Sequence, residues 1–96
     1  MKPSEALIKH RKAIRKAATA RKVCNVRVFG SALHGRDLEN SDLDLLVDTL
    51  PGATLFDLGG LQVDLEEMLG VPVDLLTPGD VPEKFRDKVL REAREI

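Results

Sequence analysis

Two short segments in which apolar side chains recur at every second position constrain the fold of this chain more than any other feature. They span Val23–Phe29 and Asp42–Val47. A period of two is that of a β-strand with one face toward a core. Gly30-Ser31 ends the first segment, and a polar loop leads to the second. The sequence therefore predicts two strands, each half covered by a core.

Helical patterns surround these strands. Helices are expected at Ser4–Ala20, with Ser4 as the N-cap, at about Thr54–Leu69 and at about Val81–Arg94. The last of them carries an apolar stripe, formed by Phe85, Val89 and Leu90. A third short strand is expected at Val71–Leu76. This order describes an α/β fold in which a mixed, three- to four-stranded sheet is covered by helices, mainly on one face.

Composition limits the class of protein. A chain of 96 residues, with 43% hydrophobic and 32% charged residues, is expected to form one domain with its own core. Three Phe, no Trp and no Tyr leave few aromatic platforms for single-stranded nucleic acid. Cys24 is the only cysteine, and no apolar run approaches a membrane span. We therefore expect a cytoplasmic protein that does not associate with membranes.

Charge is unevenly distributed along the chain. Residues 1–27 carry nine Lys and Arg side chains and a single acidic one, Glu5, although the whole chain has a net charge of -1. Two interpretations remain open for this basic segment. It is either a solvated helix face that pairs with the acidic remainder, or a docking surface for a polyanion or an acidic protein.

Three aspartates are placed for metal chemistry. Asp42 and Asp44 lie two residues apart in the second predicted strand, and Asp74 lies in the third. Residues two apart in a strand project from one face, about 6–7 Å apart along the backbone. Two such carboxylates repel unless a divalent cation lies between them, and oxygen ligands favour Mg²⁺ or Mn²⁺ over zinc. Asp74 could complete the set as a ligand or as a proton acceptor.

The Gly30-Ser31 turn suits a phosphate. A glycine at a strand end, followed by a helical turn, lets backbone N–H groups and a small hydroxyl approach a phosphate closely. If the first two strands are neighbours, this turn lies beside the aspartates, where a metal-bound triphosphate could bridge the two. Neither the dinucleotide-binding glycine pattern nor a Gly-Lys-Ser/Thr loop occurs in the chain.

The run Val28–Val47, VFGSALHGRDLENSDLDLLV, resembles the signature of the minimal nucleotidyltransferases of the DNA polymerase beta superfamily. These are small antitoxin partners of HEPN-type ribonuclease toxins. The similarity spans Val23–Leu76. It implies that residues 1–96 form one minimal nucleotidyltransferase domain with a palm-like fold.

The resemblance also implies roles for individual residues. Nucleotide binding would fall to Gly30, Ser31 and Ser41, and both catalysis and the binding of two Mg²⁺ ions to Asp42, Asp44 and Asp74. ATP would be the substrate, and some members of the family transfer AMP from it to a tyrosine of the toxin. The expected activity is therefore transfer of a nucleoside monophosphate, AMP from ATP, to a hydroxyl of a HEPN-type partner, which gives an antitoxin function.

The chain departs from the family signature at two positions. Relatives often carry arginine there, and this chain has Ala32 and His34, so fixed positive charge is missing beside the phosphate turn. Arg36 could replace part of it. These departures keep open an alternative function, a non-catalytic module that masks a partner ribonuclease. Nucleic-acid binding through the basic first helix is a third alternative, against which the scarcity of aromatic residues and the acidic remainder argue.

Two further features carry structural expectations. Asp48 is expected in a turn, beyond the end of the second strand. Gly59-Gly60 interrupts a predicted helix at a cost of about 1 kcal/mol for each glycine, which indicates close approach of another backbone.

Overall fold

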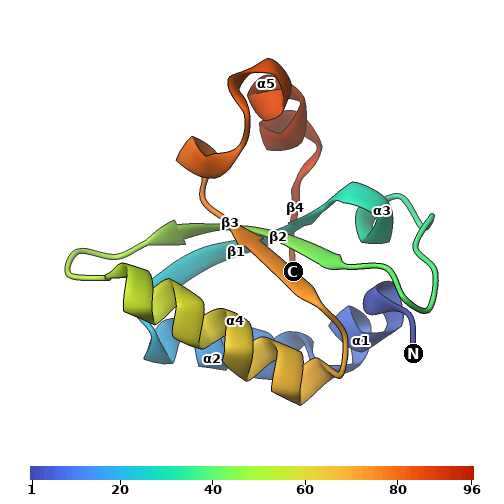
Figure 1. The fold of residues 1–96 in the computed structure, drawn as a ribbon, viewed down its shortest axis with the longest axis horizontal. Helices are drawn as coiled ribbons and strands as arrows, with labels where there is room; N and C mark the ends of the chain where they lie inside the picture. The colour runs from blue at the N-terminus through green and yellow to red at the C-terminus, as the bar shows by residue number, and fades with distance from the viewer.

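The computed structural model describes all residues, 1–96, and contains a four-stranded sheet with helices on both faces (Figure 1). In chain order the elements are α1 (Pro3–Lys9), α2 (Arg11–Ala20), β1 (Val23–Phe29), α3 (Gly30–Leu33), β2 (Leu43–Thr49), α4 (Leu55–Leu69), β3 (Val73–Leu76), the 3-10 helix η1 (Pro78–Asp80), α5 (Glu83–Glu92) and β4 (Arg94–Glu95). The predicted α/β class is confirmed.

The sheet has the strand order β3-β2-β1-β4 and is mixed. β1 and β2 pair antiparallel, β2 and β3 pair parallel, and the short β4 adds to the free edge of β1. The two strands predicted from alternation are therefore neighbours, and the third lies beside the second. This order places β2, which carries Asp44, in the interior of the sheet.

The core fills one face of the sheet, between the strands and helices α1, α2 and α4, which lie below the sheet in Figure 1. Leu43, Leu45 and Val47 of β2 point into it and are fully buried. Ile14 of α2 and Leu61 of α4 meet them from the helical layer, also fully buried. Burial of each such side chain contributes about 1.5–3 kcal/mol, so this face holds β2 rigidly. Alternation then turns the even-numbered residues of β2 to the opposite face.

The first predicted helix is two helices. His10, with φ -115° and ψ 21°, separates α1 from α2. The bend lets Leu7 of α1 and Ile14 of α2 both reach the core, although a straight helix would offer them only a thin stripe. Lys2, not Ser4, occupies the N-cap, because Pro3 suits the first helical position.

Helix α4 begins and ends as its sequence predicts. The Thr54 backbone N–H donates to Asp57 Oδ2 at 2.9 Å and the Asp57 N–H donates back to Thr54 Oγ1 at 3.3 Å, which completes a capping box. Gly70, at φ +69°, ends the helix in the left-handed conformation. None of the helices combines the length and the apolar character that a membrane-crossing helix needs.

The glycine pair within α4 is explained by a side chain, not by a second backbone as expected. A Cβ on Gly60 would overlap the Arg21 guanidinium, whereas Gly59 has open space around it. Arg21 Nε lies 3.1 Å from Asp64 Oδ2, one turn further along α4. Gly60 therefore makes room for an ion pair that joins α2 to α4.

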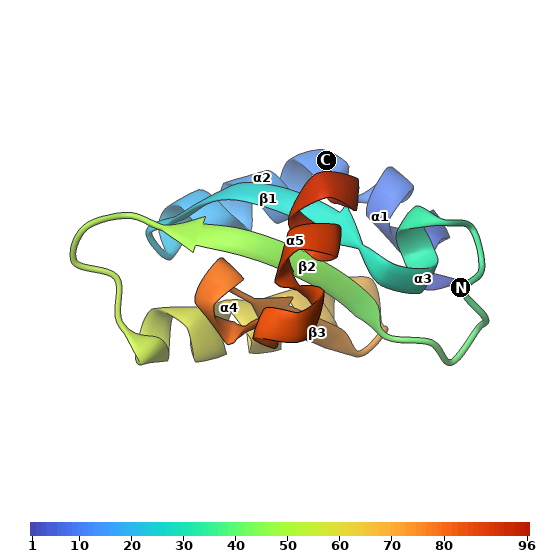
Figure 2. The same cartoon turned by 90° about the horizontal axis from the view of Figure 1, so that it is seen from above.

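The second face of the sheet is covered sparsely, by η1 and α5 (Figures 1 and 2). The last helix was expected to begin near Val81 and to carry an apolar stripe. It begins at Glu83 and none of its side chains is buried; Phe85 is 52% exposed and Leu90 is 42% exposed. The first face is already filled by three helices, so α5 lies on the face that carries Asp44 and leaves part of it accessible.

Candidate active site

The three predicted aspartates share one face and one end of the sheet. Asp44 of β2 and Asp74 of β3 are register partners in the parallel pair, and Asp42 immediately precedes β2, two residues before Asp44. Burial first, and then the negative charges of Asp74 and Asp42, together raise the pKa of Asp44 to about 6. The structure therefore brings the three carboxylates close enough to interact, with Asp44 in the middle.

This donor set fits a divalent cation bound together with a substrate. Asp42 and Asp74 are exposed and Asp44 is half-buried, so water and phosphate oxygens can reach all three. No group of three or more His, Cys, Asp or Glu side chains is arranged to hold a metal ion on its own. Mg²⁺ is commonly bound by one or two carboxylates, with the remaining ligands supplied by water and substrate phosphates. An open site whose protein ligands are all carboxylates, with Asp44 among them, matches that preference. A cation-binding role would also explain why Asp44 occupies a position that raises its pKa.

The Gly30-Ser31 turn is in direct contact with the Asp44 carboxylate. Gly30, at φ +72°, begins α3, and a Cβ there would overlap the Asp44 carboxylate, 3.2 Å from its Cγ. Only glycine combines this backbone conformation with this close approach. Ser31 is the second residue of α3 and not its N-cap, since Phe29 occupies that position. The predicted phosphate turn therefore lies against the predicted metal ligands.

Ser41, predicted to bind nucleotide, shapes the loop that leads into Asp42. Its Oγ accepts a hydrogen bond from the Leu38 N–H at 2.8 Å, and its own N–H donates to the Leu38 carbonyl at 3.0 Å. The hydroxyl proton of Ser41 stays free to donate, because an accepted bond uses only a lone pair. Contact with a nucleotide at this position stays a prediction.

Asp37, which the sequence analysis did not single out, anchors the same loop to α1. It is 4% exposed and is the only buried charged residue of the protein. Its Oδ2 accepts a 2.7 Å hydrogen bond from the Ser4 N–H at the start of α1. Burial tends to raise the pKa of Asp37, but the hydrogen bonds from Ser4 and from its own backbone outweigh burial and lower the pKa. A single Asp in a polar loop gives no sequence signal for such a role.

Replacing Asp37 with Ala should destabilise the protein by about 1–2 kcal/mol, because the start of α1 loses its acceptor. Since the folded pKa is lowered, the contribution of Asp37 is present above its unfolded pKa of 3.8 and is lost as the pH falls below that value. Urea unfolding at pH 7 and pH 3 measures both effects. Glu39→Ala is the control: Glu39 pairs with the N-terminal amine at 2.7 Å but is exposed, so less than about 0.5 kcal/mol is expected.

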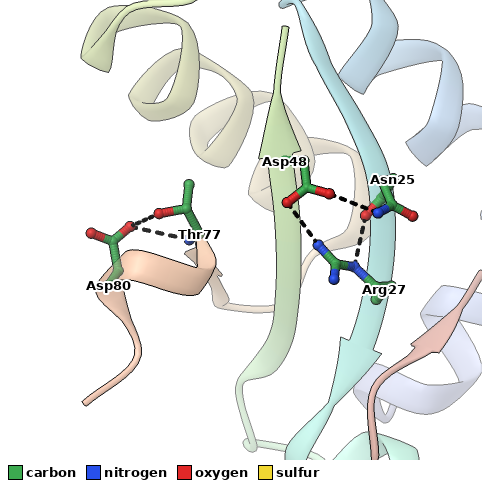
Figure 3. Close-up of polar contacts among 5 residues, drawn as sticks. All are labelled: Asn25, Arg27, Asp48, Thr77 and Asp80. Carbon is green, nitrogen blue, oxygen red and sulfur yellow. Dashed lines mark hydrogen bonds and ion pairs between the residues drawn. The ribbon is translucent and has the colours of Figure 1, made fainter. Parts of the chain in front are cut away.

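Asp48 lies in β2, although it was expected in a turn, and it belongs to a separate polar cluster on the same face (Figure 3). Asp48 Oδ1 is 3.1 Å from Arg27 Nη2, and Asp48 Oδ2 accepts from Asn25 Nδ2 at 2.7 Å. The positive charge of Arg27 therefore compensates the negative charge of Asp48, whereas no positively charged side chain pairs with Asp44. Asp48 is not part of the carboxylate cluster.

A second polar cluster in Figure 3 fixes the turn that follows β3. Asp80 Oδ2 accepts from the Thr77 hydroxyl at 2.8 Å and from the Thr77 N–H at 3.1 Å. These bonds lower the pKa of Asp80. They fold η1 into the turn through which the chain leaves β3 and enters α5.

A cavity of about 260 Å³ opens between the Gly30 turn and α5. Its walls come from both sides of the site: Phe29, Gly30 and His34 on one side, and Phe85, Lys88, Val89 and Glu92 on the other. A larger hollow of about 490 Å³ lies at the bend between α1 and α2, in the helical layer across the sheet, and it has no acidic lining. None of the three aspartates lines the smaller cavity, but Gly30, which contacts Asp44, forms part of its wall.

The fold and the site together define a nucleotidyl-transferring enzyme, with a glycine-serine turn against a carboxylate cluster on a mixed sheet. Residues 7–96 match the family described as "Nucleotidyltransferase domain". The chain therefore belongs to this family, and the resemblance found in the sequence is confirmed.

Relatives and solved structures agree with this assignment. The protein adenylyltransferase MntA of Thermococcus cleftensis is 35% identical over 86 residues, 90% of this chain and 84% of that protein. A protein of Methanocaldococcus jannaschii assigned as a protein adenylyltransferase is 39% identical over 69 residues, 72% of this chain and 74% of the relative. A structure assigned as a minimal nucleotidyltransferase has a TM-score of 0.86 at 40% identity, covering 97% of this chain and 95% of its own.

A more distant structure shares the fold. It is a toxin–antitoxin complex with AMP-PNP, with a TM-score of 0.70 at 20% identity, and the alignment covers 96% of this chain and 70% of that one. The likeness confirms the arrangement of strands and helices.

Proposed function

We propose that this protein transfers AMP from ATP, with Mg²⁺, to a hydroxyl of a partner protein, and that it thereby acts as the antitoxin of a HEPN-type ribonuclease. The observation that carries the proposal is the position of Asp44, between two further carboxylates and in contact with Gly30. Such a site combines negative charge for cations with a glycine turn for phosphates. The names of the adenylyltransferase relatives support the choice of AMP and of a protein acceptor.

The residues divide the reaction among them. Backbone N–H groups and the hydroxyl of the Gly30-Ser31 turn bind the phosphates, and Asp42 and Asp44 would hold Mg²⁺ with Asp74 as a third carboxylate. Bound Mg²⁺ would offset the charge on the attacking and leaving oxygens. Asp74 is exposed at the edge strand β3, where an acceptor hydroxyl can reach it.

The proposed chemistry is a single in-line displacement. The acceptor oxygen forms a bond to the α-phosphorus, the bond from that phosphorus to the bridging oxygen breaks, and pyrophosphate leaves with the electron pair. The proton of the hydroxyl passes to Asp74, to which we assign the role of general base. Most of the rate gain then comes from positioning and charge stabilisation, as in other phosphoryl transfers.

Label transfer separates this function from simple masking of a ribonuclease. The protein, its candidate HEPN partner, Mg²⁺ and ATP labelled at the α-phosphate are mixed, and both the label on the partner and its ribonuclease activity are measured. We expect label transfer and inhibition with the natural protein and with the control variant Asp48→Asn. Asp48 lies on the same strand and face as Asp44, but it pairs with Arg27 and does not belong to the carboxylate cluster. We expect neither label transfer nor inhibition with Asp42→Asn. Inhibition that persists without ATP and with Asp42→Asn would support the masking module and contradict the enzyme.

A further inference from the structure

The phosphate turn lacks a positive charge of its own. Ala32 of α3 is 8% exposed and belongs to the core. His34 Nε2 lies 3.3 Å from Glu92 Oε2, so any charge on the ring faces a carboxylate. Arg36 follows α3 in the loop and does not line the cavity beside Gly30. A triphosphate at Gly30 carries several negative charges and lies beside the Asp44 carboxylate, so a cationic side chain from elsewhere in the chain would add an attraction that the turn itself does not supply.

Helix α5 supplies a cation at this place. Lys88 lines the cavity of about 260 Å³ whose opposite wall includes Gly30 and His34. No hydrogen bond or ion pair engages the Lys88 ammonium, whereas Arg86 and Glu92, on the same helix, both have partners. An unpaired ammonium that faces a phosphate turn is free to bind a phosphate oxygen.

The position of Lys88 is set by contacts at the two ends of α5, not by burial of its middle. Near the start, Arg86 Nε donates to the Pro78 carbonyl at 2.9 Å and Arg86 Nη2 to the Val81 carbonyl at 3.0 Å. At the end, Glu92 contacts His34, and β4 pairs with β1. None of the α5 side chains is buried. Figure 2 shows α5 crossing over the sheet, and Lys88 lies near the middle of this helix.

We propose that Lys88 binds the β- and γ-phosphates of the nucleotide, and that the His34–Glu92 contact is the positioning pair that keeps Lys88 over the Gly30 turn. The assignment rests on the proposed function for its ligand, a nucleoside triphosphate. It gives His34 a tethering role and places the positive charge that faces the phosphate turn on α5.

Nucleotide affinity tests the assignment directly. Titration calorimetry with Mg²⁺ and a non-hydrolysable ATP analogue should show Lys88→Ala binding about 10- to 100-fold more weakly than the natural protein, as expected for loss of a charge-assisted hydrogen bond. Binding of AMP should change by less than about twofold, because AMP lacks the two phosphates. Lys88→Arg should keep most of the affinity for the analogue. Lys84→Ala is the matched control, since Lys84 lies one turn earlier, over the Phe85 ring at 5.7 Å, and does not line the cavity.

The outcomes distinguish this inference from the proposed function. Equal affinity of Lys88→Ala and the natural protein for the analogue would overturn the role of Lys88 and leave the transfer reaction standing. Equal weakening for AMP and for the analogue would also overturn it. Lys88-dependent binding without any label transfer would contradict the proposed reaction and retain the phosphate site. If the natural protein binds no analogue at all, both the role of Lys88 and the proposed function fail.

In steady-state assays Lys88→Ala should raise KM for ATP more than it lowers kcat, and Glu92→Ala should do the same to a smaller extent.

Discussion

Replacing Asp44 with Asn should reduce nucleotide transfer by more than about 100-fold and at the same time stabilise the metal-free protein at neutral pH. The two effects have the same origin. Asp44 is half-buried between Asp42 and Asp74, and no positive side chain compensates its charge. The reaction with a metal-bound nucleotide needs the negative charge of Asp44, whereas the same charge destabilises the metal-free protein. Asparagine keeps the shape and removes the charge.

The sign of the pH dependence follows from the raised pKa. Asp44 has a pKa of about 6 in the folded protein, against 3.8 when unperturbed. Below pH 3.8 the group is protonated in both states and costs nothing. As the pH rises through about 6, the folded state must give up a proton that it holds more tightly than the unfolded state does, so stability is lost. Because the carboxyl group is half-exposed and solvent screens it, we expect the loss to be about 1 kcal/mol.

Urea unfolding with EDTA, from pH 4 to pH 8, measures this difference. The stability of the natural protein should fall relative to that of Asp44→Asn between pH 4 and a little above pH 6 and then stay level to pH 8, and Mg²⁺ should restore more stability to the natural protein than to the variant. Asp48→Asn should have the opposite sign, because it leaves Arg27 without its carboxylate partner. Parallel pH curves for the natural protein and Asp44→Asn would show that Asp44 is not under electrostatic strain.

Gly30→Ala should lower stability by about 1–3 kcal/mol and transfer by about 100-fold. Two costs meet at this position. The backbone is in the left-handed region, at φ +72°, and the new methyl group would overlap the Asp44 carboxylate. The carboxylate must then move, and a displacement of about 1 Å in a reactive group is enough to cost that much rate.

A second glycine separates the two costs. Gly35, at φ +68°, has nothing within 4 Å of a Cβ. Gly35→Ala should therefore carry only the backbone strain of about 1–2 kcal/mol and keep most of the transfer activity. Urea unfolding and label transfer on both variants give the comparison. If the two variants lose transfer activity equally, the close approach of Gly30 to Asp44 does not contribute to the reaction.

Much of the sheet and the carboxylate cluster could be predicted from local patterns. Alternation in β1 and β2 reports which side chains face a core, and the period of two puts Asp42 and Asp44 on the same face regardless of what surrounds them. The capping box of α4 could be predicted for the same reason, because Thr54 and Asp57 contact each other within one helical turn. Such features depend on neighbours in sequence.

The remaining features depend on contacts between distant segments. The layer in which α5 lies is decided by the helices that already fill the other face, and its apolar stripe alone cannot tell the two faces apart. Asp37 acts through Ser4, which lies 33 positions earlier, and Gly60 accommodates Arg21 from another helix. The two-residue strand β4 is too short to leave a pattern. Asp48 was wrongly expected in a turn because its partners, Asn25 and Arg27, lie on the adjacent strand.

The separation between a buried β2 and an unburied α5 has a consequence for how such enzymes diversify. Substitutions along the exposed faces of α5 remove no core packing, so each should change stability by less than about 0.5 kcal/mol. Natural variation can therefore change the wall of the cavity beside Gly30 through this helix while the carboxylates stay fixed in the sheet. Libraries randomised at positions 85 and 89 should yield folded proteins far more often than libraries randomised at positions 43 and 45.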